Sequence, residues 1–152
     1  MHPIFGEYMK LMEALYEGFG KTIEGLPVEA LDWTPGPDMN SLAVLIVHTT
    51  GATSFLVGEV AGGIPSNRDR AAEFKVTGWD EAKLKTRLSD SLELVRGVLD
   101  KLTLDDMTKT HFSELRNRTY VYAEAVFHAL DHTGLHVGHA EITRQLWDQR
   151  KA

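Results

Sequence analysis

The sequence predicts an all-α protein, a four-helix bundle whose helices are joined by long crossover connections. Four stretches repeat apolar residues at alternating spacings of three and four, which is the period of a helix with one buried face. No stretch alternates apolar and polar residues as a half-buried strand would, and the three connections exceed the tight turns of a simple up-and-down bundle. With 152 residues, 43% of them hydrophobic, the chain can form a single domain over residues 1–152 with a substantial core.

The first helix is predicted near the N-terminus. Pro3 suits its first turn, where the missing N–H costs nothing, and Leu26-Pro27 is expected to end it. A loop with a short turn of helix at 28–33 follows, up to Asn40. The apolar stripe of this helix is Phe5, Met9, Met12, Tyr16, Phe19, Ile23 and Leu26.

The second helix is expected to begin at a cap formed by Asn40 or Ser41 and to run to Gly62-Gly63. A polar connection over residues 64–78 separates it from the third helix, predicted over residues 80–102. The second stripe is Leu45, His48, Ala52, Phe55 and Glu59, and the third is Leu84, Leu88, Leu92, Val95, Leu99 and Leu102.

The last helix is predicted after a loop over residues 103–118, with Thr119 as its N-cap. Its apolar spacing includes several histidines, which is unusual for a face that packs into a core. The predicted stripe is Val121, Ala125, His128, His132, Leu135, His139, Ile142 and Leu146.

Composition excludes several classes of protein. A net charge of −6 opposes a nucleic-acid binder, which would carry a basic face. No run of 18 apolar residues predicts a membrane span, and no secretory signal is recognisable, so a cytoplasmic location is expected. Cysteine is absent, which removes disulfides, thiolate metal ligands and cysteine nucleophiles.

The histidines are the most informative residues of the chain. His132 and His136 lie one helical turn apart, so that their imidazoles can converge on one metal ion, and His48 occupies a predicted core position of another helix. Burying each imidazole without a partner would cost about 1–3 kcal/mol. The alternative is ordinary core histidines, bonded to one another, to backbone carbonyls or to Glu124. Four of the seven histidines fall within an arc of roughly 80° on the last helix: His128, His132, His136 and His139.

The sequence lacks the more specific motifs of known metalloenzymes, phosphate-binding proteins and serine hydrolases. A zincin needs Glu after the first histidine of its helical pair, but Ala129 and Thr133 follow here. No Glu-x-x-His pairs suggest a di-iron bundle, and neither a phosphate-binding loop nor a nucleophile elbow is present. Glu59 could accept a hydrogen bond from a ligand histidine or be an exposed carboxylate at a helix end, and His2 and His111 are expected at the surface.

The chain resembles the DinB-like four-helix-bundle superfamily. One match is the segment Ser41-Leu-Ala-Val-Leu-Ile-Val-His48, with Gly62-Gly63 closing its helix. The second is the run from His128 to Gly138, which is similar to the closing His-x-x-x-His-x-Gly signature of the family. Helix lengths and loop positions agree over nearly the whole chain.

This resemblance implies three metal ligands, His48, His132 and His136, with zinc or nickel as the divalent ion, and it implies frequent homodimers. Known relatives include metal-dependent transferases and isomerases that use low-molecular-weight thiols such as bacillithiol, mycothiol or glutathione. The chain departs from the family at His139, where glutamine is usual. His139 could therefore be a fourth ligand, a proton carrier or a substitute for the hydrogen bond of the amide.

Three neutral imidazoles leave a divalent ion with an open position, as in catalytic zinc sites. Such an ion lowers the pKa of bound water toward about 7 and favours an ionised thiol. The leading hypothesis is transfer of a low-molecular-weight thiol to a small electrophile, with His128 or His139 as proton acceptor. The thiol must come from a co-substrate, since the chain has no cysteine.

Three alternatives remain at the level of the sequence. They are a metal-dependent hydrolase, a non-catalytic metal- or ligand-binding module, and an interaction domain that dimerises through its helices and holds no metal. An enzyme should have a pocket that reaches solvent beside the metal, whereas a structural site should be closed. The walls of such a pocket are expected from the first helix, at Tyr8, Met12 and Tyr16, and from the loops. The alternative for these three residues is an ordinary place in the core.

Overall fold

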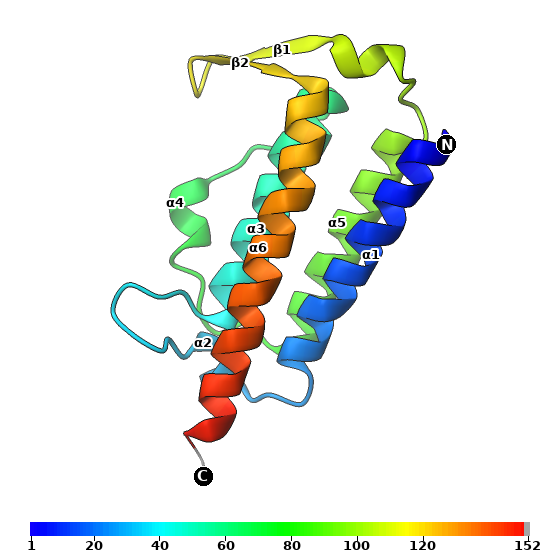
Figure 1. Ribbon diagram of the computed structural model, residues 1–152. Helices are drawn as coiled ribbons and strands as arrows, with labels where there is room; N and C mark the ends of the chain where they lie inside the picture. The colour runs from blue at the N-terminus through cyan, green and yellow to red at the C-terminus, as the bar shows by residue number, and fades with distance from the viewer. Residues whose placement is uncertain (151–152) are drawn as a thin grey trace.

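Four long helices form a bundle in the computed structural model, which describes residues 1–150 (Figure 1). They are α1 (Pro3–Ile23), α3 (Leu42–Thr53), α5 (Glu81–Leu99) and α6 (Tyr122–Gln149), and the last two turns of the predicted second helix form a π-helix, η1 (Ser54–Ala61). The connections hold short elements: α2 (Val28–Asp32), α4 (Arg70–Glu73), the 3-10 helix η2 (Asp105–Thr108) and the strands β1 (Thr110–Ser113) and β2 (Arg118–Val121).

The connections cross the bundle, as the sequence predicts. Helices α1 and α3 each pack against both α5 and α6, so α1 and α3 lie on one diagonal. Figure 1 shows α1 and α6 running in one direction and α3 and α5 in the other. Because the neighbours α3 and α5 are parallel, the chain between them must return along the bundle. That returning segment carries α4 along the outside of α3.

Helix starts follow the capping rules in most places. The side chain of Ser41 accepts a hydrogen bond from Val44 N at the start of α3, and Asp80 accepts one from Lys83 N at the start of α5. The prediction of Thr119 as the cap of the last helix is wrong, because Thr119 lies within β2 and α6 begins after Val121 without a side-chain cap.

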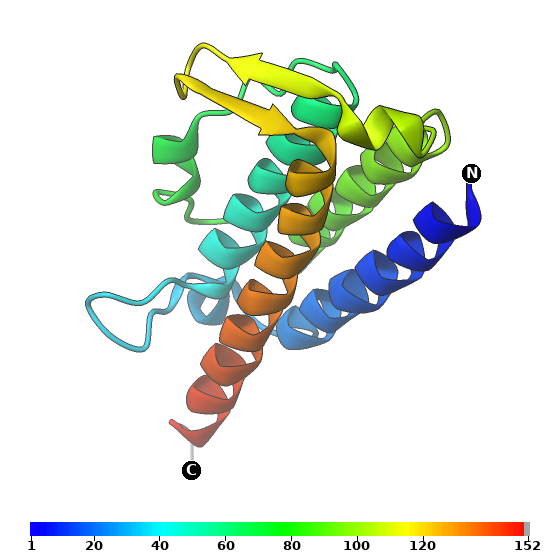
Figure 2. The same cartoon turned by 45° about the horizontal axis from the view of Figure 1, so that its top comes forward.

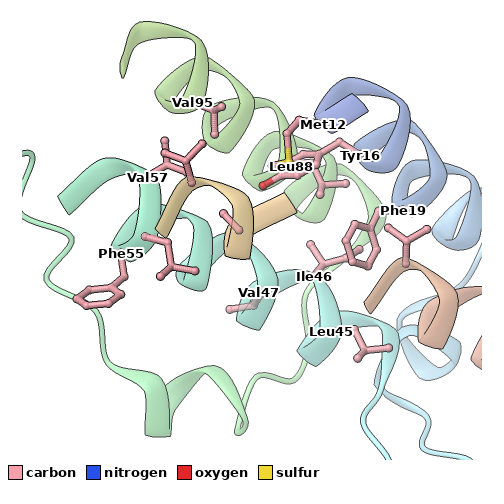
Figure 3. Close-up of a cluster of buried hydrophobic side chains, with 14 of the residues drawn as sticks. Met12, Tyr16, Phe19, Leu45, Ile46, Val47, Phe55, Val57, Leu88 and Val95 are labelled. Atoms are coloured by element: carbon pink, nitrogen blue, oxygen red, sulfur yellow. The ribbon is translucent and has the colours of Figure 1, made fainter. Parts of the chain in front are cut away.

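Helix α3 with η1 is the central element of the core. Residues Leu42–Ala61 are long and apolar enough to cross a membrane by length and composition, with a mean hydropathy of 1.4, but 89% of that window is buried inside the bundle. Its side chains meet those of α1 and α5 in the cluster drawn in Figure 3, which includes Met12, Tyr16, Phe19, Ile46, Val57, Leu88 and Val95. This burial accounts for an apolar helix that has no polar face.

A β-hairpin replaces part of the loop predicted over residues 103–118. Strands β1 and β2 pair antiparallel, from Thr110 opposite Val121 to Ser113 opposite Arg118, and cross one end of the bundle (Figure 2). Each strand has only four residues, which is too short for alternation to show in the sequence. Asn117, with φ of 48°, supplies the left-handed residue of the turn.

The predicted apolar stripe of α6 is also wrong in part. Leu135 is 55% exposed and Ile142 is 52% exposed, although both were expected in the core. The helix instead packs through a stripe of smaller residues, which lets it lie close to α1 and α3. The buried residues of α6 are Ala125, Val126, Ala129, Thr133, Val137, Ala140, Thr143 and Trp147. His132 and His136 flank this stripe and are half-buried.

Candidate metal centre

Three imidazoles converge where α3 packs against α6. His48 comes from α3, and His132 and His136 come from successive turns of α6. One ring nitrogen of each lies within 4.8 Å of those of the other two, a group that could hold a metal ion. The ring centroid of His48 is 5.1 Å from that of His132 and 5.2 Å from that of His136. The spacing of four residues on α6 and a third histidine on another helix therefore meet at one point.

The donor atoms suit a tetrahedral ion. Nε2 of His132 lies 3.2 Å from Nε2 of His136. Two nitrogens that bind one tetrahedral zinc at 2.0–2.1 Å are separated by about 3.3 Å, so this pair already has the spacing of two ligands. Nδ1 of His132 is buried and has no hydrogen-bond partner within residues 1–150. One polar atom of His132 is therefore left without a partner among the described residues.

The two histidines of α6 are neutral near pH 7. Burial, followed by the neighbouring imidazoles of His136 and His48, lowers the pKa of His132 to about 3. Burial and the proximity of His48 lower the pKa of His136 to about 4. Since a metal binds the unprotonated nitrogen, protons compete little for these two side chains above pH 5.

A buried carboxylate orients His48. Nδ1 of His48 lies 3.0 Å from Oε2 of Glu73, the last residue of α4. An ionised carboxylate only accepts hydrogen bonds, so Nδ1 carries the proton and Nε2 keeps a free lone pair for a metal. Arg68 donates from Nε to Oε1 of Glu73 at 2.7 Å and from Nη2 to Oε2 at 2.8 Å, so that Glu73 is held from both sides.

The ion pair keeps Glu73 charged despite its burial. Burial raises the pKa of the Glu73 carboxyl, but hydrogen bonds from Arg68 and His48 outweigh it and bring the pKa to about 2. The carboxylate reaches this position because residue 51 of α3 has no side chain. A Cβ at Gly51 would lie 2.1 Å from Oε1 and 2.8 Å from Cδ of Glu73. Gly51 is therefore part of the support of His48.

Sequence reasoning missed Glu73, Arg68 and Gly51. Glu73 is 25 residues away from His48 along the chain and lies in a connection that was predicted to be polar loop. Glu59, the acceptor considered instead, is bound by Ser66, whose backbone N and Oγ both donate to its Oε2. The sequence offers one usable signal, the polar segment Arg68-Asp-Arg70-Ala-Ala-Glu73 beside an otherwise apolar helix.

The other two histidines of α6 have different positions. His139 is exposed, and its Nδ1 lies 3.3 Å from Nδ1 of His136, so it hydrogen-bonds the outer side of that imidazole. His128 is also exposed and lies 5.8 Å from His132, measured between ring centroids. Neither belongs to the three-histidine group. Glu124, the carboxylate considered as a histidine partner, forms an ion pair with Arg118 instead.

A pocket of about 290 Å³ opens beside this group. His48 and His132 lie in its wall, and its exposed lining includes His128 and Arg116, so the pocket connects the histidines to solvent. Of the walls expected from the first helix and the loops, the structure places only loop residues here, such as Arg68 and Arg116. Tyr8, Met12 and Tyr16 are buried in the core and do not line this pocket, because α3, α6, the hairpin and the segment before α4 enclose it.

The fold and the site define a helical-bundle protein with a three-histidine group that is compatible with metal binding. The chain belongs to the DinB superfamily, whose family model matches residues 11–140. The resemblance seen in the sequence is thereby confirmed, and the all-α bundle is confirmed with it.

Solved structures with low sequence identity have the same fold. The crystal structure of a conserved protein from Enterococcus faecalis superposes with a TM-score of 0.78 at 17% identity, covering 93% of this chain and 95% of that one. A mycothiol-dependent maleylpyruvate isomerase superposes with a TM-score of 0.61 at 12% identity. This chain is covered to 88% and spans 59% of the length of the isomerase. No curated protein matches the sequence.

Proposed function

We propose that this protein is a metal-dependent enzyme that holds a divalent ion, zinc or nickel, on His48, His132 and His136. The favoured reaction is transfer of a low-molecular-weight thiol to a small electrophile. The observation that carries this proposal is the convergence of three imidazoles beside a pocket that opens to solvent, with His48 and His132 in the pocket wall. The structural likeness to a mycothiol-dependent isomerase supports a thiol as the co-substrate.

The chemistry divides between the ion and the side chains. A divalent ion on three neutral imidazoles supplies Lewis-acid chemistry that favours the deprotonated form of a thiol or of water. Glu73 fixes the tautomer of His48, and burial keeps His132 and His136 unprotonated, so the donor atoms are ready without prior loss of protons. His128, exposed in the same pocket, is positioned to accept the thiol proton.

His139 has a different part in this proposal. Its contact with Nδ1 of His136 makes it a positioning residue for that ligand, in the place of the family's glutamine. It does not line the pocket that holds His48 and His132, which makes His128 the better candidate for proton transfer. Of the two proton carriers suggested by the sequence, only His128 reaches the reaction space.

Two other functions use the same group of histidines. A hydrolase would use water where the transferase uses a thiol, and a binding module would hold the metal or a ligand without turnover. An open pocket beside the histidines supports an enzyme over a closed structural site. The chain has no cysteine to supply a thiol, so the transferase requires the thiol as a second substrate.

The test combines metal analysis with a thiol-transfer assay on untagged protein. We expect close to one zinc or nickel ion per chain after loading, and conjugation of a thiol to an aryl chloride or epoxide by the loaded protein. His132→Ala should lose both. His2→Asn is the matched control, because it removes an exposed imidazole and keeps a side chain that can cap α1.

The metal-analysis result decides the outcome. Fewer than about 0.2 ions per chain after loading would overturn the proposal, since a three-imidazole catalytic site should fill under these conditions. Full loading with a conjugation rate that His132→Ala leaves unchanged would overturn the enzymatic part alone. Hydrolysis of an ester without thiol transfer would select the hydrolase.

We further propose a cytoplasmic homodimer that binds neither nucleic acid nor membranes. The exposed apolar side chains of α1 and α6 support a dimer face, because Ile4, Leu11 and Phe127 are each more than half exposed. They line one apolar pocket together with Leu104. Sedimentation of the purified protein tests the dimer directly.

A further inference from the structure

The pocket beside the three histidines is basic in an otherwise acidic protein. The chain has a net charge of −6 and eight arginines. Four of the eight line this one pocket, and no lysine does: Arg68, Arg70, Arg116 and Arg118. Arginine is the side chain that binds carboxylate and phosphate groups with two parallel hydrogen bonds, whereas lysine presents a single point charge. The pocket thus concentrates the side chain that is best suited to oxyanions.

The four arginines come from two distant parts of the chain. Arg68 lies just before α4, and Arg70 is the first residue of α4. Arg116 lies in the turn of the hairpin, and Arg118 is the first residue of β2. Figures 1 and 2 both show the tip of the hairpin and the segment before α4 on the same side of the α3–α6 pair. The crossover connection and the hairpin therefore supply two basic edges to one cavity.

Two of the arginines are already neutralised. Arg68 makes the bidentate pair with Glu73, and Arg118 pairs with Glu124. Arg70 and Arg116 have no carboxylate within 4 Å among residues 1–150, although Glu59 acts on Arg116 from a longer distance. The pocket consequently keeps positive charge that the protein does not satisfy.

Aromatic rings hold the free guanidinium groups in place. The guanidinium carbon of Arg116 lies 4.7 Å from the centroid of the Phe55 ring, and that of Arg70 lies 5.0 Å from the centroid of Phe74. The ring of Phe74 is in turn 4.6 Å from that of His48. A ring face restrains a guanidinium and leaves its N–H edge free to donate. Such preorganisation lowers the entropy lost when an anion binds.

From this geometry we infer that the pocket binds an oxyanion, a carboxylate or phosphate group carried by one of the two co-substrates, through Arg70 and Arg116. The assignment of the anionic group to a co-substrate rests on the proposed function, but the anion site itself does not need the metal. The anionic group would be held in the same cavity that His48 and His132 line, which places the rest of the substrate beside the histidines.

The first experiment measures anion binding by the full chain, with and without zinc. The probes are succinate and inorganic phosphate, and binding is followed by isothermal titration calorimetry at low salt. The variants are Arg70→Gln and Arg116→Gln, each expected to weaken binding about tenfold, which corresponds to roughly 1.4 kcal/mol. The control is Arg96→Gln, an equal loss of charge on α5 outside the pocket.

The outcomes separate this inference from the proposed function. Binding to the metal-free chain that falls in both pocket variants and persists in Arg96→Gln supports the anion site, even if metal loading fails. If binding weakens equally in all three variants, it depends on the overall charge of the protein and not on the pocket, which overturns the anion site. If anion binding requires zinc and has the same affinity in both pocket variants as in the parent protein, the anion binds to the metal. That result overturns the anion site and leaves the metal centre intact.

A kinetic comparison assigns the anionic group to one co-substrate. The thiols are 3-mercaptopropionate and its neutral counterpart 2-mercaptoethanol, and the electrophiles are an aryl chloride with and without a carboxylate. A lower KM for the carboxylated member of one pair, lost in Arg116→Gln, identifies the bound co-substrate. Equal KM values within both pairs would overturn the assignment of the anion to a substrate.

Discussion

The substitution Gly51→Ala tests the support of His48 most sharply. Helix propensity alone predicts that alanine at residue 51, inside the continuous helix formed by α3 and η1, stabilises the protein by about 1 kcal/mol. The structure predicts the opposite, because the added Cβ would lie 2.1 Å from Oε1 and 2.8 Å from Cδ of Glu73. The carboxylate must leave its place between Arg68 and His48. The sign of the change in the free energy of unfolding therefore distinguishes helix propensity from the loss of the Glu73 contacts.

The magnitude follows from what Glu73 loses. Breaking a buried ion pair costs about 3–5 kcal/mol, because one charge is left without its partner. The propensity gain of about 1 kcal/mol offsets part of this. We expect a net loss of about 2–4 kcal/mol in the free energy of unfolding, together with a 10–100-fold loss in zinc affinity, the usual cost of removing the partner of a ligand histidine.

Urea unfolding of the metal-free protein and competition for zinc with a chromophoric chelator measure the two quantities. Gly97→Ala is the matched control, because Gly97 also lies in a helix and a Cβ there meets nothing within 4 Å. It should be neutral or slightly stabilising, with unchanged zinc affinity. A Gly51→Ala protein that is as stable as the parent and binds zinc equally well would refute the assigned role of Glu73.

Three further outcomes are expected. Folding lowers the pKa of His132 to about 3 and that of His136 to about 4, so between these values and pH 6.5 the unfolded chain binds more protons than the folded one. The metal-free protein should therefore lose stability as the pH falls through this window. A urea midpoint that stays constant from pH 7 to pH 5 would contradict this. His128→Ala should lower kcat with zinc content unchanged, whereas His139→Ala should weaken zinc binding severalfold, as titrations and turnover of the loaded proteins would show. Phe127→Glu should convert a dimer into a monomer in sedimentation without changing zinc affinity, and an unaltered sedimentation coefficient would remove the proposed face.

The parts of the fold that depend on local sequence were predictable. The four long helices and the short helix near residue 28 follow from apolar spacing and caps, and the cap at Ser41 acts as expected. The hairpin was not predictable, since four-residue strands carry too little pattern and are stabilised by packing at the end of the bundle. Tyr120, buried against Phe55, is the contact that anchors it.

The error in α6 has a general physical cause. Large aliphatic side chains such as Leu135 and Ile142 were assigned to the core because of their hydrophobicity, but the close approach of α6 to its neighbours selects smaller residues such as Ala129 and Thr133. Hydrophobicity at helical spacing gives the period of a buried face and does not always give its direction. The exposed aliphatic residues are then available for a partner surface.

The candidate site was predictable where one helix or a motif defines it. Helical spacing places His132 and His136 together. The predicted core position of His48 on another helix, and then the resemblance, added a third histidine, which the structure brings to the same point. The contacts of His48 with Glu73 and Arg68 depend on how a crossover connection returns along the bundle, and spacing within helices holds no information on that path. Functional groups on long connections are therefore the ones that sequence patterns miss.

The most direct test is an anomalous difference map at the absorption edge of the metal, from crystals of the zinc- or nickel-loaded protein. The predicted result is one strong peak about 2.1 Å from a ring nitrogen of His48, His132 and His136 alike, with Nε2 as the donor of His48. A map with no peak at this point, or an ion bound by only one of the three imidazoles, would contradict the metal centre.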